Sequence, residues 1–176
     1  GCNCMRWRHR LAGGKVLDPS AGMGVFARTK PDSAAVEQIE LDSISGEING
    51  LLNDGPTVAT RVASFEEVAA STDDETFDAV VTNVPFGDKS MRGAHWRKDR
   101  KYQNANLQEY FILRGLEKIK PGGFAAFIVP TSVISGKGGK GVKLRNAVSM
   151  ASEFVGAYRM PNVVFDEAGA DVATDI

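Results

Sequence analysis

The stretch Val16-Leu17-Asp18-Pro19-Ser20-Ala21-Gly22-Met23-Gly24 joins a short apolar run to a turn that contains two glycines. The apolar run predicts a buried strand over Lys15–Asp18, and the residues from Gly24 to Thr29 predict a helix. In an open α/β sheet, such a turn lies at the carboxyl edge, where ligands bind. Its glycines would let a ligand approach the backbone, and the helix start would offer free N–H groups. A plain tight turn is the alternative.

The rest of the chain alternates strand-like and helix-like segments. Further strands are expected over Ala35–Glu40, Thr57–Val62, Phe77–Thr82, Phe124–Val129 and Phe154–Arg159. Helices are expected over Ser43–Leu52, Phe65–Ala70, Asn106–Ile119 and Val142–Ala151. This alternation predicts βαβ units, hence an α/β domain with a mostly parallel twisted sheet and helices on both faces.

Capping and turn residues mark where one of these helices is expected to begin and end. Asn106 and Glu109 fit a capping box at the start of the third of these helices, and Pro121-Gly122-Gly123 is predicted to stop it. The stretch Gly136–Gly141 contains only glycine and lysine and is expected to form a surface loop.

Composition limits the classes of protein to consider. The chain has 176 residues, enough for one domain over 1–176, with residues 1–13 as an N-terminal extension. Its apolar runs are too short to cross a bilayer and no signal peptide is recognisable, which favours the cytoplasm. The sequence begins without Met, and Val172–Ile176 resembles the opening of a strand, so we expect a fragment of a larger protein.

A metal site is not expected. The cysteines are Cys2 and Cys4, and the histidines are His9 and His95. Their spacing does not supply the four ligands of a structural zinc site.

Two acids suggest what the glycine turn binds. Asp18 stands at the strand tip, where a carboxylate could bind the ammonium group of a methionine moiety but would repel a pyrophosphate. Glu40 ends the next strand, the usual place for an acid that binds ribose hydroxyls. Residues Gly22 to Ala27 also fit the loose dinucleotide-binding pattern, which is weak evidence by itself. The alternative for Glu40 is a solvated acid at a strand end.

The segment Asn83-Val84-Pro85-Phe86 follows the fourth strand, at the same sheet edge. The Asn83 oxygen and the Val84 carbonyl could accept hydrogen bonds from an exocyclic amino group. Phe86 could stack on the base, and Pro85 stiffens the backbone around it. An ordinary turn with a core phenylalanine is the alternative.

A long basic loop is predicted from residue 87 to residue 105. Although the net charge of the chain is −1, this loop carries six cations, which are candidates for nucleic-acid contacts. They are Lys89, Arg92, Arg97, Lys98, Arg100 and Lys101. Trp96 and Tyr102 would add stacking surfaces. A solvated linker is the alternative, and Lys137, Lys140 and Lys143 are weaker candidates for backbone contacts.

The motifs together resemble those of adenine-N6 DNA methyltransferases. The matching elements are the glycine turn with Asp18, the stretch from Ile39 to Asp42 and the tetrapeptide from Asn83 to Phe86. More narrowly, the chain is similar to the methylase module of helicase-methyltransferase proteins of phages, plasmids and bacteria. This narrower resemblance also uses Glu109-Tyr110-Phe111, Pro121-Gly122-Gly123 and Arg159-Met160-Pro161-Asn162.

The resemblance implies a Rossmann-like class I methyltransferase fold with a last antiparallel strand, S-adenosylmethionine as cofactor and DNA as partner. The implied cofactor-binding residues are Asp18, Pro19, Ser20, Ala21, Gly22, Gly24, Glu40, Leu41, Ser64, Phe65 and Asn83. For Phe65, packing in the core is an alternative. The common motif is Asn-Pro-Pro-aromatic, so Val84 is a departure that is expected to leave the backbone less rigid. The implied reaction is direct in-line methyl transfer to the N6 amino group of a flipped adenine.

Other functions remain open on the sequence. RNA-base and protein-glutamine methyltransferases present similar planar amino groups to similar motifs, and the basic loop favours a nucleic acid. A non-catalytic module of a helicase-like protein belongs to a different class. A nicotinamide-dependent oxidoreductase is disfavoured by Asp18 and by the residues from Asn83 to Phe86.

Overall fold

The computed structural model describes residues 13–86, 99, 101–102, 105–160 and 174–175. The strands are β1 (Lys15–Asp18), β2 (Ala35–Glu40), β3 (Val58–Val62), β4 (Phe77–Asn83), β5 (Ile119–Pro130) and β6 (Thr174–Asp175). The helices are α2 (Val25–Thr29), α3 (Ser43–Asn53), α4 (Phe65–Ser71), α5 (Leu107–Glu117), α6 (Thr131–Ser135) and α7 (Gly139–Ala151).

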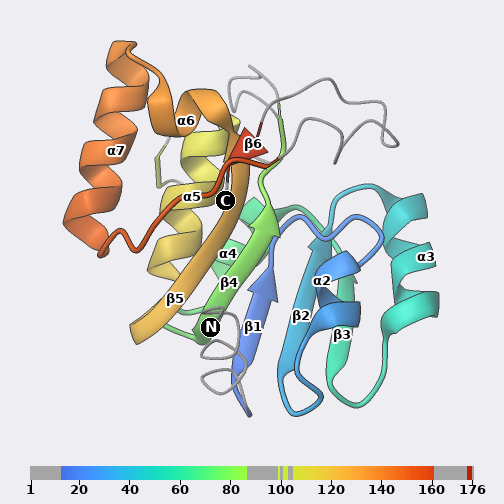
Figure 1. Ribbon diagram of the computed structural model, residues 1–176. Coiled ribbons are helices and arrows are strands. Elements are labelled where there is room, and N and C mark those ends of the chain that lie inside the picture. The colour runs from blue at the N-terminus through green and yellow to red at the C-terminus, as the bar shows by residue number, and fades with distance from the viewer. Residues whose placement is uncertain (1–12, 87–98, 100, 103–104, 161–173, 176) are drawn as a thin grey trace.

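The strands form one 6-stranded sheet in the order β3-β2-β1-β4-β5-β6 (Figure 1). Neighbouring strands from β3 to β5 run parallel, while β6 pairs antiparallel with β5. The chain order reverses between β1 and β4, so β1 lies at the switch point of the sheet. The carboxyl ends of β1, β2 and β4 therefore meet at one edge, which is the ligand edge of such folds.

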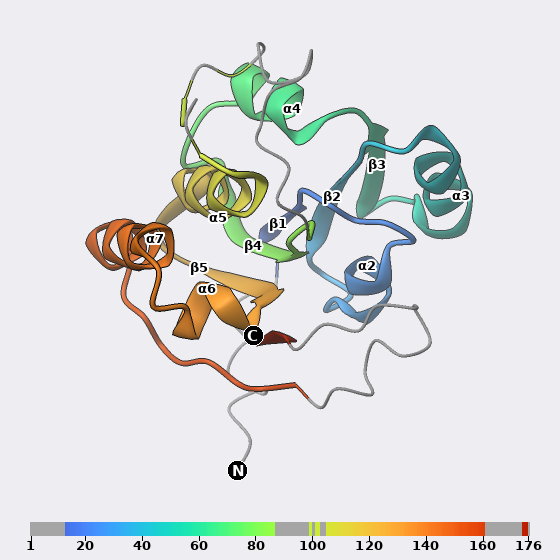
Figure 2. The ribbon, with the colours of Figure 1, turned by 90° about the horizontal axis from the view of Figure 1, so that it is seen from above.

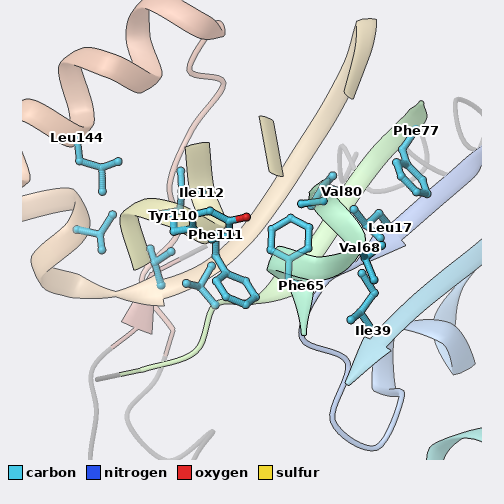
Figure 3. Close-up of a cluster of buried hydrophobic side chains, with 14 residues drawn as sticks. Leu17, Ile39, Phe65, Val68, Phe77, Val80, Tyr110, Phe111, Ile112 and Leu144 are labelled. Carbon is cyan, nitrogen blue, oxygen red and sulfur yellow. The ribbon is translucent and has the colours of Figure 1, made fainter. Parts of the chain in front are cut away.

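Helices cover both faces of this sheet, as predicted. Seen from above, α4, α5 and α7 lie on one side and α2 lies on the other (Figure 2). Alternate residues of a strand serve the two faces. In β1, Val16 packs with Ala27 of α2, whereas Leu17 belongs to the larger core that includes Phe65 and Phe111 (Figure 3).

Most predicted elements form within one or two residues of their expected bounds. The capping box at the start of α5 is confirmed, because the Asn106 side chain accepts a hydrogen bond from the Glu109 amide and the Glu109 carboxylate accepts one from the Asn106 amide. The antiparallel last strand is confirmed by β6. Helix α6 was not predicted.

The predicted role of Pro121-Gly122-Gly123 as a helix stop is wrong. Helix α5 ends at Glu117, and the three residues lie within β5, where the pairing with β4 is irregular between Phe77 and Ala79. A Cβ at Gly123 would lie 2.6 Å from the Asp78 carbonyl, so the strands approach too closely there for any side chain. The glycine serves a bulge.

The strand predicted over Phe154–Arg159 is also wrong. Residues 153–158 form no strand, and Phe154, Val155 and Tyr158 are largely exposed. The edge of β5 pairs instead with β6. Nor is the glycine–lysine stretch a loop throughout, because α7 already begins at Gly139. Within the described residues, no helix is long and apolar enough to span a membrane.

Candidate functional site

Asp18, Glu40 and Asn83 are the last residues of β1, β2 and β4. Because β1 pairs with β2 on one side and with β4 on the other, the topology brings the three predicted side chains to the same sheet edge. Their oxygens are hydrogen-bond acceptors, so this edge is suited to cationic, amino or hydroxyl groups of a ligand.

Asp18 is completely buried. One carboxyl oxygen, Oδ1, accepts a hydrogen bond from the Ser20 amide at 3.3 Å. Burial disfavours the charged form and raises the pKa of Asp18 to about 7, and the hydrogen bonds from the Thr82 hydroxyl and the Ser20 amide offset only part of that rise. A bound cation would offset that cost, so Asp18 is a carboxyl group whose charge depends on a partner.

The glycine turn is held by internal hydrogen bonds. The Ala21 amide donates to the Ile39 carbonyl at 2.9 Å, and the Gly24 amide donates to the Ala21 carbonyl at 2.8 Å. Glu40 accepts from the amides of Gly22 and Asp42, both at 2.8 Å. Backbone and carboxylate acceptors therefore already engage the amides of Ala21, Gly22 and Gly24 in this turn. The predicted free N–H groups at the helix start stay a prediction for the residues of α2 itself.

The Asn83 side chain ends in an unpaired buried oxygen. Its Oδ1 makes no hydrogen bond within the part of the chain that the structure describes. The hydroxyl of the fully buried Thr82 lies beside the Asp18 carboxyl and, as a hydrogen-bond donor, lowers the pKa of that group. Buried polar atoms are rarely left unpaired, so the Asn83 oxygen indicates a ligand.

Val84 of the tetrapeptide is tied into the sheet and the core. Its side chain is fully buried in the main core, and its amide donates to the Ile128 carbonyl at 3.0 Å. Proline has no N–H and could not make this bond. The expectation that Val84 leaves the backbone less rigid than a proline would stays a prediction, and this hydrogen bond restrains the residue in the folded protein. Pro85 and Phe86 follow as half-buried residues.

Ser64 and Phe65 have structural partners. The Ser64 hydroxyl caps α4 by accepting a hydrogen bond from the Glu67 amide at 3.2 Å. The Phe65 ring lies 5.0 Å from the Phe111 ring, centroid to centroid, within the main core (Figure 3). Phe65 therefore packs in the hydrophobic core, which was the alternative to a cofactor-binding role. Leu41, by contrast, is an apolar side chain left 60% exposed next to Glu40.

The basic loop can be followed only at its end. Lys89, Arg92, Arg97, Lys98 and Arg100 lie outside the described residues, as do Cys2, Cys4, His9 and His95. The Lys101 ammonium group pairs with Asp74 at 2.8 Å and with Glu117 at 3.2 Å. Any contact of Lys101 with a nucleic acid would therefore compete with two acids of the domain itself.

One acid of this loop, Asp99, was missed as an important residue. It is buried, and its Oδ2 accepts hydrogen bonds from Arg114 at 2.6 Å and from Tyr110 at 2.7 Å. Burial alone would raise the pKa of the Asp99 carboxyl, but Arg114 and the other donors hold it below its usual value. Asp99 thereby anchors its part of the loop to α5.

The chain is similar in sequence to proteins of restriction and modification systems. A family model for the Eco57I restriction-modification methylase matches residues 23–155. The chain is 42% identical over 164 residues to the defense against restriction protein B of Escherichia phage P1, which covers 93% of this chain and 7% of that protein. It is 32% identical over 90 residues to the type I restriction enzyme EcoKI methylase subunit of Escherichia coli strain K12, which covers 51% of this chain and 16% of that subunit.

The solved structures agree on the fold. The type I restriction-modification methyltransferase subunit of Streptococcus thermophilus superposes with a TM-score of 0.72 at 19% identity, over 93% of this chain and 39% of that subunit. The architecture is the Rossmann-like fold of class I S-adenosylmethionine-dependent methyltransferases, as the sequence implied. The chain spans only a small part of the curated relatives that it matches. It belongs to the Eco57I restriction-modification methylase family.

Proposed function

We propose that this chain transfers a methyl group from S-adenosylmethionine to the N6 amino group of adenine in DNA. The observation that carries the proposal is a pair of buried acceptors at the ends of two adjacent strands: the Asn83 Oδ1 has no partner among the described residues, and the Asp18 carboxyl has no described cation beside it. A ligand that brings an ammonium group and an amino group to this edge would satisfy them.

The residues fit S-adenosylmethionine. The buried Asp18 carboxylate would receive the ammonium group, and Glu40 keeps acceptor capacity for ribose hydroxyls beyond its two backbone bonds. The exposed Leu41 offers an apolar surface for the adenine ring. Pro19, Ser20, Ala21, Gly22 and Gly24 would line the methionine and ribose parts. When bound, the cofactor supplies an electrophilic methyl group on a sulfonium.

The residues that follow β4 would prepare the target base. The adenine amino group is a poor nucleophile because its lone pair is delocalised into the ring. If the two N–H groups of this amino group donate hydrogen bonds to the Asn83 oxygen and the Val84 carbonyl, the lone pair becomes localised on the nitrogen for in-line attack. Pro85 restricts the backbone, and Phe86 would stack on a base flipped out of the duplex. The acceleration comes from positioning and from preorganised dipoles.

DNA contacts are proposed for the basic loop that follows this motif. Lys89, Arg92, Arg97, Lys98 and Arg100 would neutralise phosphates, while Lys101 would have to exchange its own ion pairs. The chain would act as the methylase module of a longer protein, since its matches cover 7% and 16% of two relatives. A helicase part within such a protein belongs to the same proposal.

Binding is tested by isothermal titration of the folded protein with S-adenosylmethionine and, separately, with NAD. The expected result is saturable binding of the methyl donor and none of the dinucleotide. No binding of the donor by a folded sample would refute the proposal.

Transfer is tested with tritiated methyl donor and three acceptors: duplex DNA, RNA and a glutamine-containing peptide. DNA labelling on adenine N6 is expected to fall at least ~100-fold in Asn83→Ala, the order of magnitude for one preorganised catalytic hydrogen-bonding group. Asn146→Ala, which truncates an exposed asparagine on α7, is the control and should retain wild-type transfer. Preferred labelling of RNA or peptide would identify the corresponding alternative substrate.

A further inference from the structure

A network of buried amides lies directly beneath the glycine turn. Gln38 of β2 and Asn49 of α3 are both completely buried. The Gln38 side chain donates to Oδ1 of Asn49 at 3.1 Å and to the Thr60 hydroxyl at 3.0 Å. Asn49 in turn donates from Nδ2 to the Gly22 carbonyl at 3.0 Å. The network thus reaches from β3, through β2 and α3, to the turn.

The next carbonyl of the turn is held in the same way. Nδ2 of Asn53, one helical turn after Asn49, donates to the Met23 carbonyl at 3.2 Å and to Oδ1 of Asn49 at 2.7 Å. A Cβ at Gly24 would lie 2.4 Å from that same Oδ1. The turn therefore rests on the amides without room for a side chain between them.

This turn needs such support because of its backbone. Gly22 and Gly24 have φ values of 52° and 75°, in the left-handed region. Glu40 holds the Gly22 amide from one side, and Asn49 holds the Gly22 carbonyl from the other. Gly22, which lies in the turn that lines the proposed cofactor site, is thus held through both its amide and its carbonyl.

We propose that Asn49 is a positioning residue for the methyl donor: it holds the Gly22 carbonyl and so keeps the turn in the shape that binds the cofactor. The inference rests on the proposed function. Asn49 acts through the turn and not on the methyl group itself, so its loss should raise the KM for the donor and leave kcat at saturating donor unchanged.

The test is titration of S-adenosylmethionine into Asn49→Ala and into a matched control, Thr60→Val. Thr60 lies at the far end of the same network, where it accepts from Gln38 and donates to Asp54 at 2.6 Å, and it does not touch the turn. Both variants should unfold at a lower temperature. Only Asn49→Ala should bind the donor about ten-fold more weakly, which corresponds to about 1.4 kcal/mol.

The outcomes separate the two proposals. If the wild type and Asn49→Ala bind S-adenosylmethionine with equal affinity, the role of Asn49 is overturned and the proposed function is left intact. Equal weakening in both variants also overturns it, because general loss of stability would then be the cause. No donor binding by the wild-type protein overturns both proposals. If Asn49→Ala does not fold, Asn53→Ala removes the bond to the Met23 carbonyl instead, and unchanged donor affinity there would refute the inference.

Discussion

Replacement of Asp18 by asparagine should change how the stability of the protein depends on pH. Burial raises the pKa of Asp18 from about 3.8 to about 7 in the folded protein. Between these values the unfolded chain has lost the proton and the folded chain still holds it, so the stability of the wild-type protein falls as pH rises. Above about pH 7 both states are ionised and this contribution is constant. Asparagine has a similar shape and no proton to lose.

The size of the effect follows from the separation of the two pKa values. About three pKa units at 1.36 kcal/mol each correspond to about 4 kcal/mol. The free energy of unfolding of Asp18→Asn, minus that of the wild type, should therefore grow by about 4 kcal/mol from pH 4 to pH 8. Comparing the same pair of proteins at two pH values cancels any packing change that the substitution causes.

Urea unfolding followed by circular dichroism, at intervals from pH 4 to pH 8, measures this difference. Asp42→Asn is the control. The backbone hydrogen bond from Ser45 lowers the pKa of Asp42, so the stability contributed by its ionised form is lost mainly below pH 4, and this variant should keep a nearly constant difference from the wild type between pH 4 and pH 8. Parallel stability curves for Asp18→Asn and the wild type would refute the reasoning about a buried carboxyl with a raised pKa. The same variant should lose donor binding, although its stability relative to the wild type should be greatest at pH 8.

Two further substitutions test the surroundings of the site. Val84→Pro, a change toward the common family motif, should destabilise the protein by about 1–3 kcal/mol because it leaves the Ile128 carbonyl unpaired. Chemical denaturation measures this loss, and a stabilised variant would contradict the role given to the Val84 amide. Asp99→Ala should destabilise the protein by about 3 kcal/mol, since it removes one partner of the buried Arg114 and of the Tyr110 hydroxyl. An unchanged unfolding midpoint would show that these hydrogen bonds do not anchor the loop at Asp99.

The sequence predicted the sheet edge well because its signals are local. Short apolar runs ended in Asp18, Glu40 and Asn83, and parallel topology alone then brings strand ends together. The prediction of a strand over Phe154–Arg159 failed because a local sequence pattern does not reveal whether a sheet edge is already occupied, here by β6.

Other features depend on tertiary contacts that no local pattern contains. Asp99 looked like a lone acid among cations, and its importance arises from Arg114, which is close only in the folded chain. The role of Thr82 likewise follows only from the folded chain, where its buried hydroxyl lies beside the Asp18 carboxyl. Buried polar side chains inside strands are the signal that a sequence reading could have weighed more heavily.

The bond from the Val84 amide to the Ile128 carbonyl has a consequence for thermal inactivation. A motif stiffened by two proline rings keeps its local shape even where the neighbouring sheet frays. Asn-Val-Pro-Phe instead takes part of its order from the pairing of β4 with β5, at positions where Asn83 lies opposite Ile128. The competence of the tetrapeptide should therefore vanish together with the central sheet, in one cooperative event, rather than outlast it.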